Sequence, residues 1–187
     1  MQEKLVNVSL PEGNFDITVL VFDESDRKIL YQIYNEWRSL CDNLVKFKAR
    51  AVNLPEGLSE SAFCLEMGFG RFIGSISGAN TSFDCLDLKT SERIQVKACS
   101  VLPDLTSFGP KSVWDKIYFV DFCRKGKWDG TFDIYLLNNK DIYNHKVNAD
   151  QTLRDQQLEG RRPRFSIYKE LIQEKNIKPI KTATLKK

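Results

Sequence analysis

The sequence predicts an α/β (α+β) domain with a central mixed β-sheet flanked by helices. Short apolar runs rich in β-branched and aromatic residues recur along the chain, amphipathic helical segments lie between them, and glycine or proline marks the breaks. With 187 residues, 42% of them hydrophobic, the chain is long enough for one compact core. It contains no repeats, low-complexity tracts or long linkers, so we expect a single domain over residues 1–187.

The first fifty residues predict a strand pair and a long helix. Residues 4–10 and 14–22 have strand-like composition and are separated by a Pro-Glu-Gly turn at 11–13. Acids at 23–26 can cap a helix over 26–47. Its apolar residues form one stripe: Ile29, Leu30, Ile33, Trp37, Leu40, Cys41 and Leu44. The stripe is expected to pack against the core, or in part against a second subunit.

The rest of the chain alternates strands, turns and short helices. Ser59 is the expected cap of a helix over 59–67 that ends at Gly68. The other predicted strands are 69–76, 83–88, 94–99, 117–122 and 132–137, and the predicted helices are 139–146 and 166–176, with a helical turn at 112–116. Residues 89–93 are polar and turn-like, so 83–88 and 94–99 are expected to form a hairpin.

The composition and the distribution of charge indicate the kind of binding partner and the cellular compartment. The net charge is only +3, but residues 161–187 carry nine Lys or Arg against Glu170 and Glu174, which indicates a localised anionic partner. A solvated tail is the alternative after Lys178. Five scattered cysteines without a CxxC, and one histidine, His145, argue against zinc and for a reducing compartment. No membrane span or signal peptide is visible, so we expect a cytoplasmic protein without a membrane partner or an organic cofactor.

The predicted hairpin contains the residues with the clearest chemistry. Gln95 and Lys97 are two apart on one strand and therefore share a face. A two-residue turn at 90–91 sets Lys89 opposite Glu92 and brings Asp84 to that face, whereas a slip of one residue brings Asp87 instead. Such a face offers a carboxylate and an amide oxygen for a divalent cation, with a lysine to orient water near a phosphodiester.

A second group of residues is suited to binding DNA. Residues 151–166 are dense in guanidinium and amide side chains, which contact phosphates and purine edges. The candidates are Arg161, Arg162, Arg164, Gln156 and Gln157, with Ser107 and Lys111 from the polar loop before Trp114. The alternative is that the arginines only pair with Asp155 and Glu159.

The chain resembles the PD-(D/E)XK nucleases and, within them, the small type II restriction endonucleases that cut GCNGC. The matching stretches are residues 53–60, 82–84, 95–97, 105–115, 142–147 and 160–166. The resemblance implies a homodimer that cleaves double-stranded DNA with Mg²⁺, leaving 5′-phosphate ends. Gln95 departs from the family's usual acid, which lowers the charge of the metal site.

The same resemblance assigns roles to the residues. Asp84, Gln95, the carbonyl of Val96 and Glu60 would hold the metal, and Lys97 would position the attacking water. Glu60 is the expected acid of the helix before the sheet, with Glu66 and Glu56 as alternatives and a simple first-turn glutamate as the structural reading. His145 as a general base is the weaker interpretation than a structural histidine.

Residues 1–52 would then support dimerisation, 53–137 form the catalytic core and 138–187 contact DNA. Two other functions fit these residues: a structure-specific repair or recombination nuclease, and a non-catalytic nucleic-acid-binding module.

Overall fold

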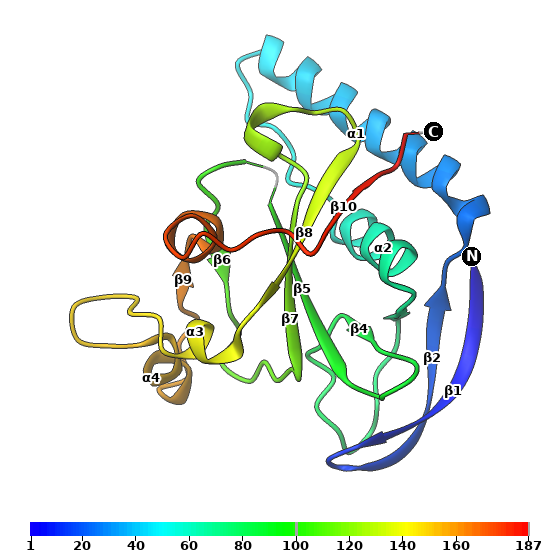
Figure 1. The fold of residues 1–187 in the computed structure, drawn as a ribbon, viewed down its shortest axis with the longest axis vertical. Helices are drawn as coiled ribbons and strands as arrows, with labels where there is room; N and C mark the ends of the chain where they lie inside the picture. The colour runs from blue at the N-terminus through cyan, green and yellow to red at the C-terminus, as the bar shows by residue number, and fades with distance from the viewer. Residues whose placement is uncertain (100, 187) are drawn as a thin grey trace.

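One eight-stranded mixed sheet organises the molecule. The computed structural model describes residues 1–99 and 101–186. The strand order is β1-β2-β3-β4-β5-β7-β8-β10, and a separate two-stranded sheet joins β6 to β9. Within the described residues β5 and β7 run parallel, and the other ladders are antiparallel. Helices flank this strongly curled sheet (Figure 1), which confirms the predicted fold class.

The elements have the following bounds. The strands are β1 Gln2–Leu10, β2 Gly13–Val21, β3 Gly70–Phe72, β4 Cys85–Leu86, β5 Arg93–Cys99, β6 Thr106–Ser107, β7 Lys116–Asp121, β8 Thr131–Leu137, β9 Arg164–Phe165 and β10 Lys181–Thr184. The helices are α1 Arg27–Lys46, α2 Glu56–Met67, α3 Asn139–Tyr143 and α4 Leu153–Leu158, with 3₁₀ turns η1 Glu24–Asp26 and η2 Arg124–Gly126 and a π-helical segment η3 Tyr168–Gln173. No helix in the described ranges is long and apolar enough to cross a membrane.

The two faces of the central strands bury different cores. Alternate side chains of β5 and β7, such as Ile94 and Val120, pack with α1 and α2 in one cluster. The intervening side chains of β7, including Phe119, pack with the C-terminal segment that carries Phe165 and Ile167. Gln95 and Lys97 point to this second side because they alternate with Ile94 and Val96. The sheet therefore separates an N-terminal helical layer from the C-terminal layer.

The apolar stripe of α1 is buried only in part. Leu30, Trp37 and Cys41 are buried as predicted, together with Tyr34, which packs on Phe122 at a ring distance of 6.0 Å. Ile29, Ile33 and Leu40 remain 49%, 38% and 50% exposed. The expectation that the whole stripe packs against the core of the same chain is therefore wrong. The body contacts one side of the helix, whose other apolar residues face away from it.

Several local predictions are also wrong. Ser59 does not cap α2: the helix begins at Glu56 after Pro55, and the Ser59 hydroxyl donates to the Glu56 carbonyl at 3.0 Å. Gly68 ends the helix with φ 71°, as predicted. The strand predicted at 69–76 covers only β3 because residues 73–84 form an irregular loop. The turn at 112–116 is not helical, and residues 151–166 include the unpredicted helix α4.

The C-terminal residues are part of the fold and not a solvated tail. β10 pairs with β8 at the sheet edge, with Ala183 opposite Phe132. Leu185, just after it, is 1% exposed and lies in the same core cluster as Ile134. The alternating Thr-Ala-Thr-Leu pattern places one small and one large apolar residue on the buried side, which is enough to hold a short edge strand.

Candidate active site

Asp84 and Gln95 are in direct contact in the structure. Cys85 pairs with Ile94, so Asp84 lies opposite Gln95 just beyond the end of β4. The Asp84 carboxylate accepts the side-chain amide N–H of Gln95 and, at 2.7 Å, the backbone N–H of Val96. These donors leave the Gln95 amide oxygen and the second Asp84 oxygen as possible metal ligands.

The hairpin register differs from the predicted one, although Asp84 still reaches the predicted face. The backbone N–H of Asp87 donates to the Glu92 carbonyl at 3.0 Å, so Asp87, and not Lys89, lies opposite Glu92. The four intervening residues form a wider turn in which Ser91 has φ 60°. A shift of two residues preserves the facing of side chains, and Asp87 falls on the other face.

Lys97 lies on the same face as Gln95, two residues further along β5. Its ammonium is close enough to Asp84 to lower the pKa of that carboxyl, although burial, the larger effect, leaves that pKa raised. The Lys97 Nζ also lies 5.9 Å from the ring centroid of Phe108, a fully buried residue that follows β6. An aromatic ring thus flanks the lysine and connects it to the C-terminal layer.

Glu60 approaches the same centre from α2. Its carboxylate forms an ion pair with Arg71 of β3, with 2.7 Å between Nε and Oε2. Burial first, and then the charge of Asp84, raise the pKa of Glu60 to about 7 against the lowering effect of Arg71. Two carboxylates with raised pKa values, of which Asp84 raises that of Glu60, form a site short of positive charge, which a divalent cation can supply.

The alternative acids have other surroundings. Glu66 pairs with Arg27 at 2.7 Å and with Lys181 at 2.8 Å, so it links α2 to α1 and β10. Glu56 is exposed one helical turn before Glu60, and its charge raises the pKa values of both Glu60 and Asp84. Glu56 therefore adds negative potential at the rim of the site.

His145 has a structural environment. Its ring stacks on Phe165 with centroids 4.0 Å apart, and its Nε2 lies 2.9 Å from Glu170 Oε2. The partner that sequence could not identify is thus Glu170, three residues into the segment of η3. His145 therefore links the segment after α3 to β9 and η3 within the C-terminal layer.

The donor set fits a metal with oxygen ligands. Within residues 1–99 and 101–186 no group of three or more His, Cys, Asp or Glu is arranged to hold an ion. Two carboxylates and one amide oxygen are instead available from Glu60, Asp84 and Gln95, and hard cations such as Mg²⁺ accept this set when water completes the coordination.

The arginine-rich segment lies beside this centre. Arg164 pairs with Ser107 across the β6–β9 sheet, and Phe108 stacks on Phe165 at 5.4 Å. Arg161 is exposed and pairs with Glu159 at 3.1 Å, as the salt-bridge alternative expected. Arg162 and Arg164 are exposed, with no ion pair among the described residues. Gly160 and Pro163 keep this segment out of α4, so the arginines project from a turn and a short strand.

The remaining candidates divide into exposed and buried side chains. Lys111 is exposed, and Gln156 is half-buried with its amide 3.3 Å from Gln151 Oε1. Gln157 is only 3% exposed and donates its amide N–H to the Gly109 carbonyl at 2.7 Å. The Gln157 side-chain oxygen and the Ser107 hydroxyl are buried without a hydrogen-bond partner in the described structure. Gln157 therefore holds the 109 loop in this conformation and does not present its amide to solvent.

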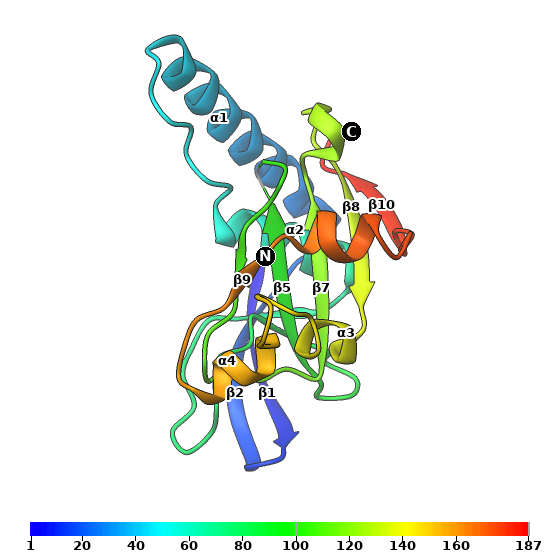
Figure 2. The ribbon, with the colours of Figure 1, turned by 90° about the vertical axis from the view of Figure 1, so that its left-hand side faces the viewer.

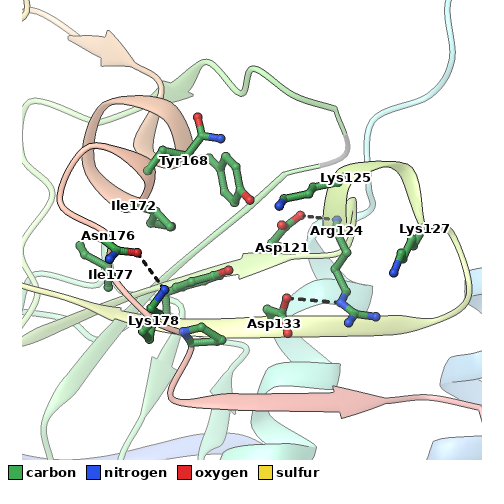
Figure 3. A pocket seen from close by; sticks show the side chains of 13 residues that line it. Asp121, Arg124, Lys125, Lys127, Asp133, Tyr168, Ile172, Asn176, Ile177 and Lys178 are labelled. Atoms are coloured by element: carbon green, nitrogen blue, oxygen red, sulfur yellow. Dashed lines mark hydrogen bonds and ion pairs between the residues drawn. The ribbon is translucent and has the colours of Figure 1, made fainter.

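A solvent-open pocket lies away from these residues. It is bordered by the η2 turn and the η3 segment and lined by side chains such as Asp121, Lys125 and Tyr168 (Figure 3). Asp121 accepts the backbone N–H groups of Cys123 and Arg124 at 2.8 and 2.9 Å, and the Arg124 side chain reaches Asp133 at 3.3 Å. Asp121 and Asp133, two acids of the pocket lining, thus hold the turn after β7. None of the candidate catalytic residues lines this pocket.

Comparison with known proteins identifies the class. Residues 22–174 match the family model described as Bsp6I restriction endonuclease. The chain is also 35% identical over 167 residues, 88% of this chain and 91% of the relative, to the type II restriction enzyme Bsp6I of Bacillus sp. (strain RFL6). No solved structure matches.

These matches define an endodeoxyribonuclease of the type II restriction class. The chain belongs to the Bsp6I restriction endonuclease family. The matched range includes every candidate site residue from Glu60 to Arg164.

Sequence reasoning missed Arg71 and Phe108. Arg71 lies opposite Cys85 in the β3–β4 ladder, next to Asp84, and is the cation paired with Glu60. The chain offered one signal for it: a lone arginine between Gly70 and Phe72 in a strand-like run. Phe108 had no distinguishing signal, since its approach to Lys97 depends on how the β6–β9 sheet packs.

Proposed function

We propose that this restriction endonuclease makes Mg²⁺-dependent double-strand cuts at a short palindromic DNA site, as the nuclease of a restriction-modification system. The observation that supports this most is the contact between Asp84 and the Gln95–Val96 segment, with Lys97 on the same face. Phosphodiester hydrolysis needs an oxygen-ligated cation, an oriented water and positive charge near the phosphate. These residues offer each of them.

The roles follow from the positions. Asp84, Gln95 and Glu60, with the carbonyl of Val96, would hold the cation, and when bound it would supply positive charge at the scissile phosphate. Lys97 orients the attacking water and offsets phosphate charge, because it is two residues from Gln95 on the same face. Arg71 keeps the Glu60 carboxylate oriented toward the site in the metal-free protein.

We further propose that the core is of the PD-(D/E)XK type and that the target is GCNGC. The support is the order of the elements: α2 with its acid, then the antiparallel β3–β4–β5 with Asp84 and Gln-x-Lys, then the parallel strand β7. GCNGC rests only on the sequence resemblance. A nuclease that meets cellular DNA in this way would act in the cytoplasm.

A homodimer would match a palindromic site, with each subunit cutting one strand. The exposed apolar residues of α1, Ile29, Ile33 and Leu40, support an interface between two copies on this helix. Residues 1–52 would thus serve dimerisation, 53–137 catalysis, and 138–187 DNA contact through Arg161, Arg162, Arg164, Gln156 and the β6–β9 sheet with Lys111.

Cleavage of a sequenced plasmid tests the proposal. Purified protein is incubated with the plasmid in Mg²⁺ or in EDTA, beside a Lys97→Ala variant and a Lys4→Ala control on the exposed face of β1. We expect discrete fragments that require Mg²⁺ with the parent and the control. The Lys97→Ala variant should bind DNA but lose at least about 100-fold in cleavage rate, the usual effect of removing a positioned proton-transfer group.

Each outcome is informative. Fragment ends that do not read GCNGC would refute the target but not the nuclease. Intact plasmid together with cut branched substrates would indicate a structure-specific nuclease of the same fold. Intact DNA of both kinds with a persistent gel shift would refute cleavage and favour a binding module.

A further inference from the structure

The C-terminal end of α1 continues into a short basic segment, residues 46–50, which we call the basic arm. It contains Lys46, Lys48 and Arg50, and no acid occurs from residue 43 to residue 55. All five residues of the arm are exposed, and Phe47 is 85% exposed. Figure 2 shows this end of α1 projecting beyond the sheet and the rest of the body. The arm is thus a cationic protrusion with an aromatic residue at its centre.

The arm has an ordered backbone. The Ala49 N–H donates to the Leu44 carbonyl at 3.0 Å and the Lys48 N–H to the Val45 carbonyl at 2.9 Å, the two bonds of a Schellman helix end. Lys48 occupies the left-handed position of that motif with φ 58°, where glycine is favoured. A lysine at a glycine position keeps a charge there that the turn itself does not require.

The charges of the arm are not neutralised within the described chain. Lys46 Nζ donates to Asn43 Oδ1 at 3.2 Å, a neutral partner. Among the described residues Lys48 and Arg50 form no ion pair. The negative end of the helix dipole accounts for a cation in the last turn, Lys46, but its effect fades within one turn. Lys48 and Arg50 therefore retain charge available to an external anion.

The arm is connected to the candidate active site by a short tethered segment. Five residues, 51–55, separate Arg50 from Glu56, and the segment spans at most about 20 Å. Val52 in this segment accepts the Trp37 indole N–H at 3.1 Å, so the connection is anchored to α1. The segment runs from the end of α1 down to the start of α2 (Figures 1 and 2), where Glu56 and Glu60 border the site. Phosphates of one strand follow at about 3.4 Å, so this segment is no longer than about six base pairs of duplex.

We propose that the basic arm binds backbone phosphates of the duplex on the flank of the recognised bases. The proposal rests on the proposed function, because it requires duplex DNA at the Asp84–Lys97 centre. The charge of the arm favours DNA over a second copy of the chain, because a two-fold contact centred here would bring two clusters of three cations together. The exposed residues Ile29, Ile33 and Leu40 lie earlier on the helix and remain free for such a copy.

The test compares two variants of equal charge change. The arm variant replaces Lys46, Lys48 and Arg50 by Gln, and the control variant replaces Lys4, Lys28 and Lys186 by Gln. The control residues are exposed and lie near the two termini and the start of α1, on the side of Figure 1 away from the arm. The dissociation constant of the protein–DNA complex is measured between 50 and 300 mM salt, with Ca²⁺ in place of Mg²⁺. The duplexes extend either 3 or about 12 base pairs beyond the recognised bases. Cleavage in Mg²⁺ is measured in parallel, and thermal melting checks folding.

The arm variant should lose two to three units of the slope of log K against log salt on the long duplex, at about 0.9 per phosphate contact. Its affinity should fall at least tenfold there and change little on the short duplex, while its fragment pattern stays that of the parent. A slope and affinity equal to those of the control would overturn the inference while the proposed function stands. An altered oligomeric state with an unchanged salt slope would assign the arm to a subunit interface instead. Absence of DNA binding and cleavage in the parent would overturn both.

Discussion

The buried carboxylate of Glu60 should make the metal-free protein less stable as the pH rises. Its pKa is raised to about 7 from the ordinary 4.5, mainly by burial and by Asp84. The folded state therefore binds more protons than the unfolded state between these values, so the free energy of unfolding falls as pH increases through this window and is level above it. A shift of this size corresponds to about 3 kcal/mol.

Glu60→Gln removes that pH dependence. The raised pKa already includes the opposing effect of the ion pair with Arg71, so the loss of that pair is not subtracted again. The variant should therefore be about 3 kcal/mol more stable than the parent at pH 8 in EDTA, and its advantage should shrink to below about 1 kcal/mol near pH 5. Urea unfolding followed by tryptophan fluorescence from pH 5 to 8.5 measures both curves.

The control and the refuting result are well defined. Glu56→Gln removes an exposed carboxylate one turn earlier in the same helix and should keep most of the pH dependence of the parent, because burial and Asp84 raise the pKa of Glu60 more than Glu56 does. Parallel curves for the parent and Glu60→Gln would refute the claim that burial and Asp84 raise the pKa of Glu60. Added Mg²⁺ should then stabilise the parent at pH 8, by about 1.4 kcal/mol at ten times the dissociation constant, and stabilise the variant less.

Three further substitutions test the core, the DNA surface and the histidine. Phe63→Ala empties a fully buried position on α2 between two other aromatic rings and should cost about 3–5 kcal/mol in urea unfolding; a loss below 1 kcal/mol would contradict the packing. Arg164→Ala should weaken DNA binding in gel shifts and leave unfolding within about 0.5 kcal/mol, because the side chain is exposed; unchanged affinity would remove it from the DNA surface. His145→Ala loses the stack on Phe165 and the contact with Glu170, so it should lower stability by about 1–2 kcal/mol and still cleave DNA; loss of cleavage in a folded variant would restore the general-base reading.

Local pattern predicted the elements with strong periodicity. The β1–β2 pair, helix α1 and strands β5, β7 and β8 lie where alternation or helical spacing placed them. The facing of Gln95 and Lys97 also follows from a period of two and is independent of the fold. Elements of two or three residues, such as β3, β4, β6 and β9, leave no periodic signal, and their existence depends on partners far away in sequence.

Only some of the contacts in the candidate site could be predicted from local sequence pattern. A hairpin brings Asp84 to the face of Gln95 through a local turn, so residue spacing reduced the choice to Asp84 or Asp87, and the observed register places Asp84 opposite Gln95. The Glu60–Arg71 ion pair joins α2 to β3. Gln157 points inward because α4 packs against the loop at Gly109. Neither arrangement has a signature in the order of residues.

The sequence by itself determined the mixed fold class, the basic C-terminal region and the shared face of Gln95 and Lys97, because these depend on composition and on side-chain alternation along single strands. Only the tertiary structure decided which side of α1 is buried, that residues 181–184 close the sheet edge, and how Glu60 and Phe108 meet the hairpin. Those features depend on which surfaces pack together, and burial of apolar area selects among packings that the chain order leaves equally open.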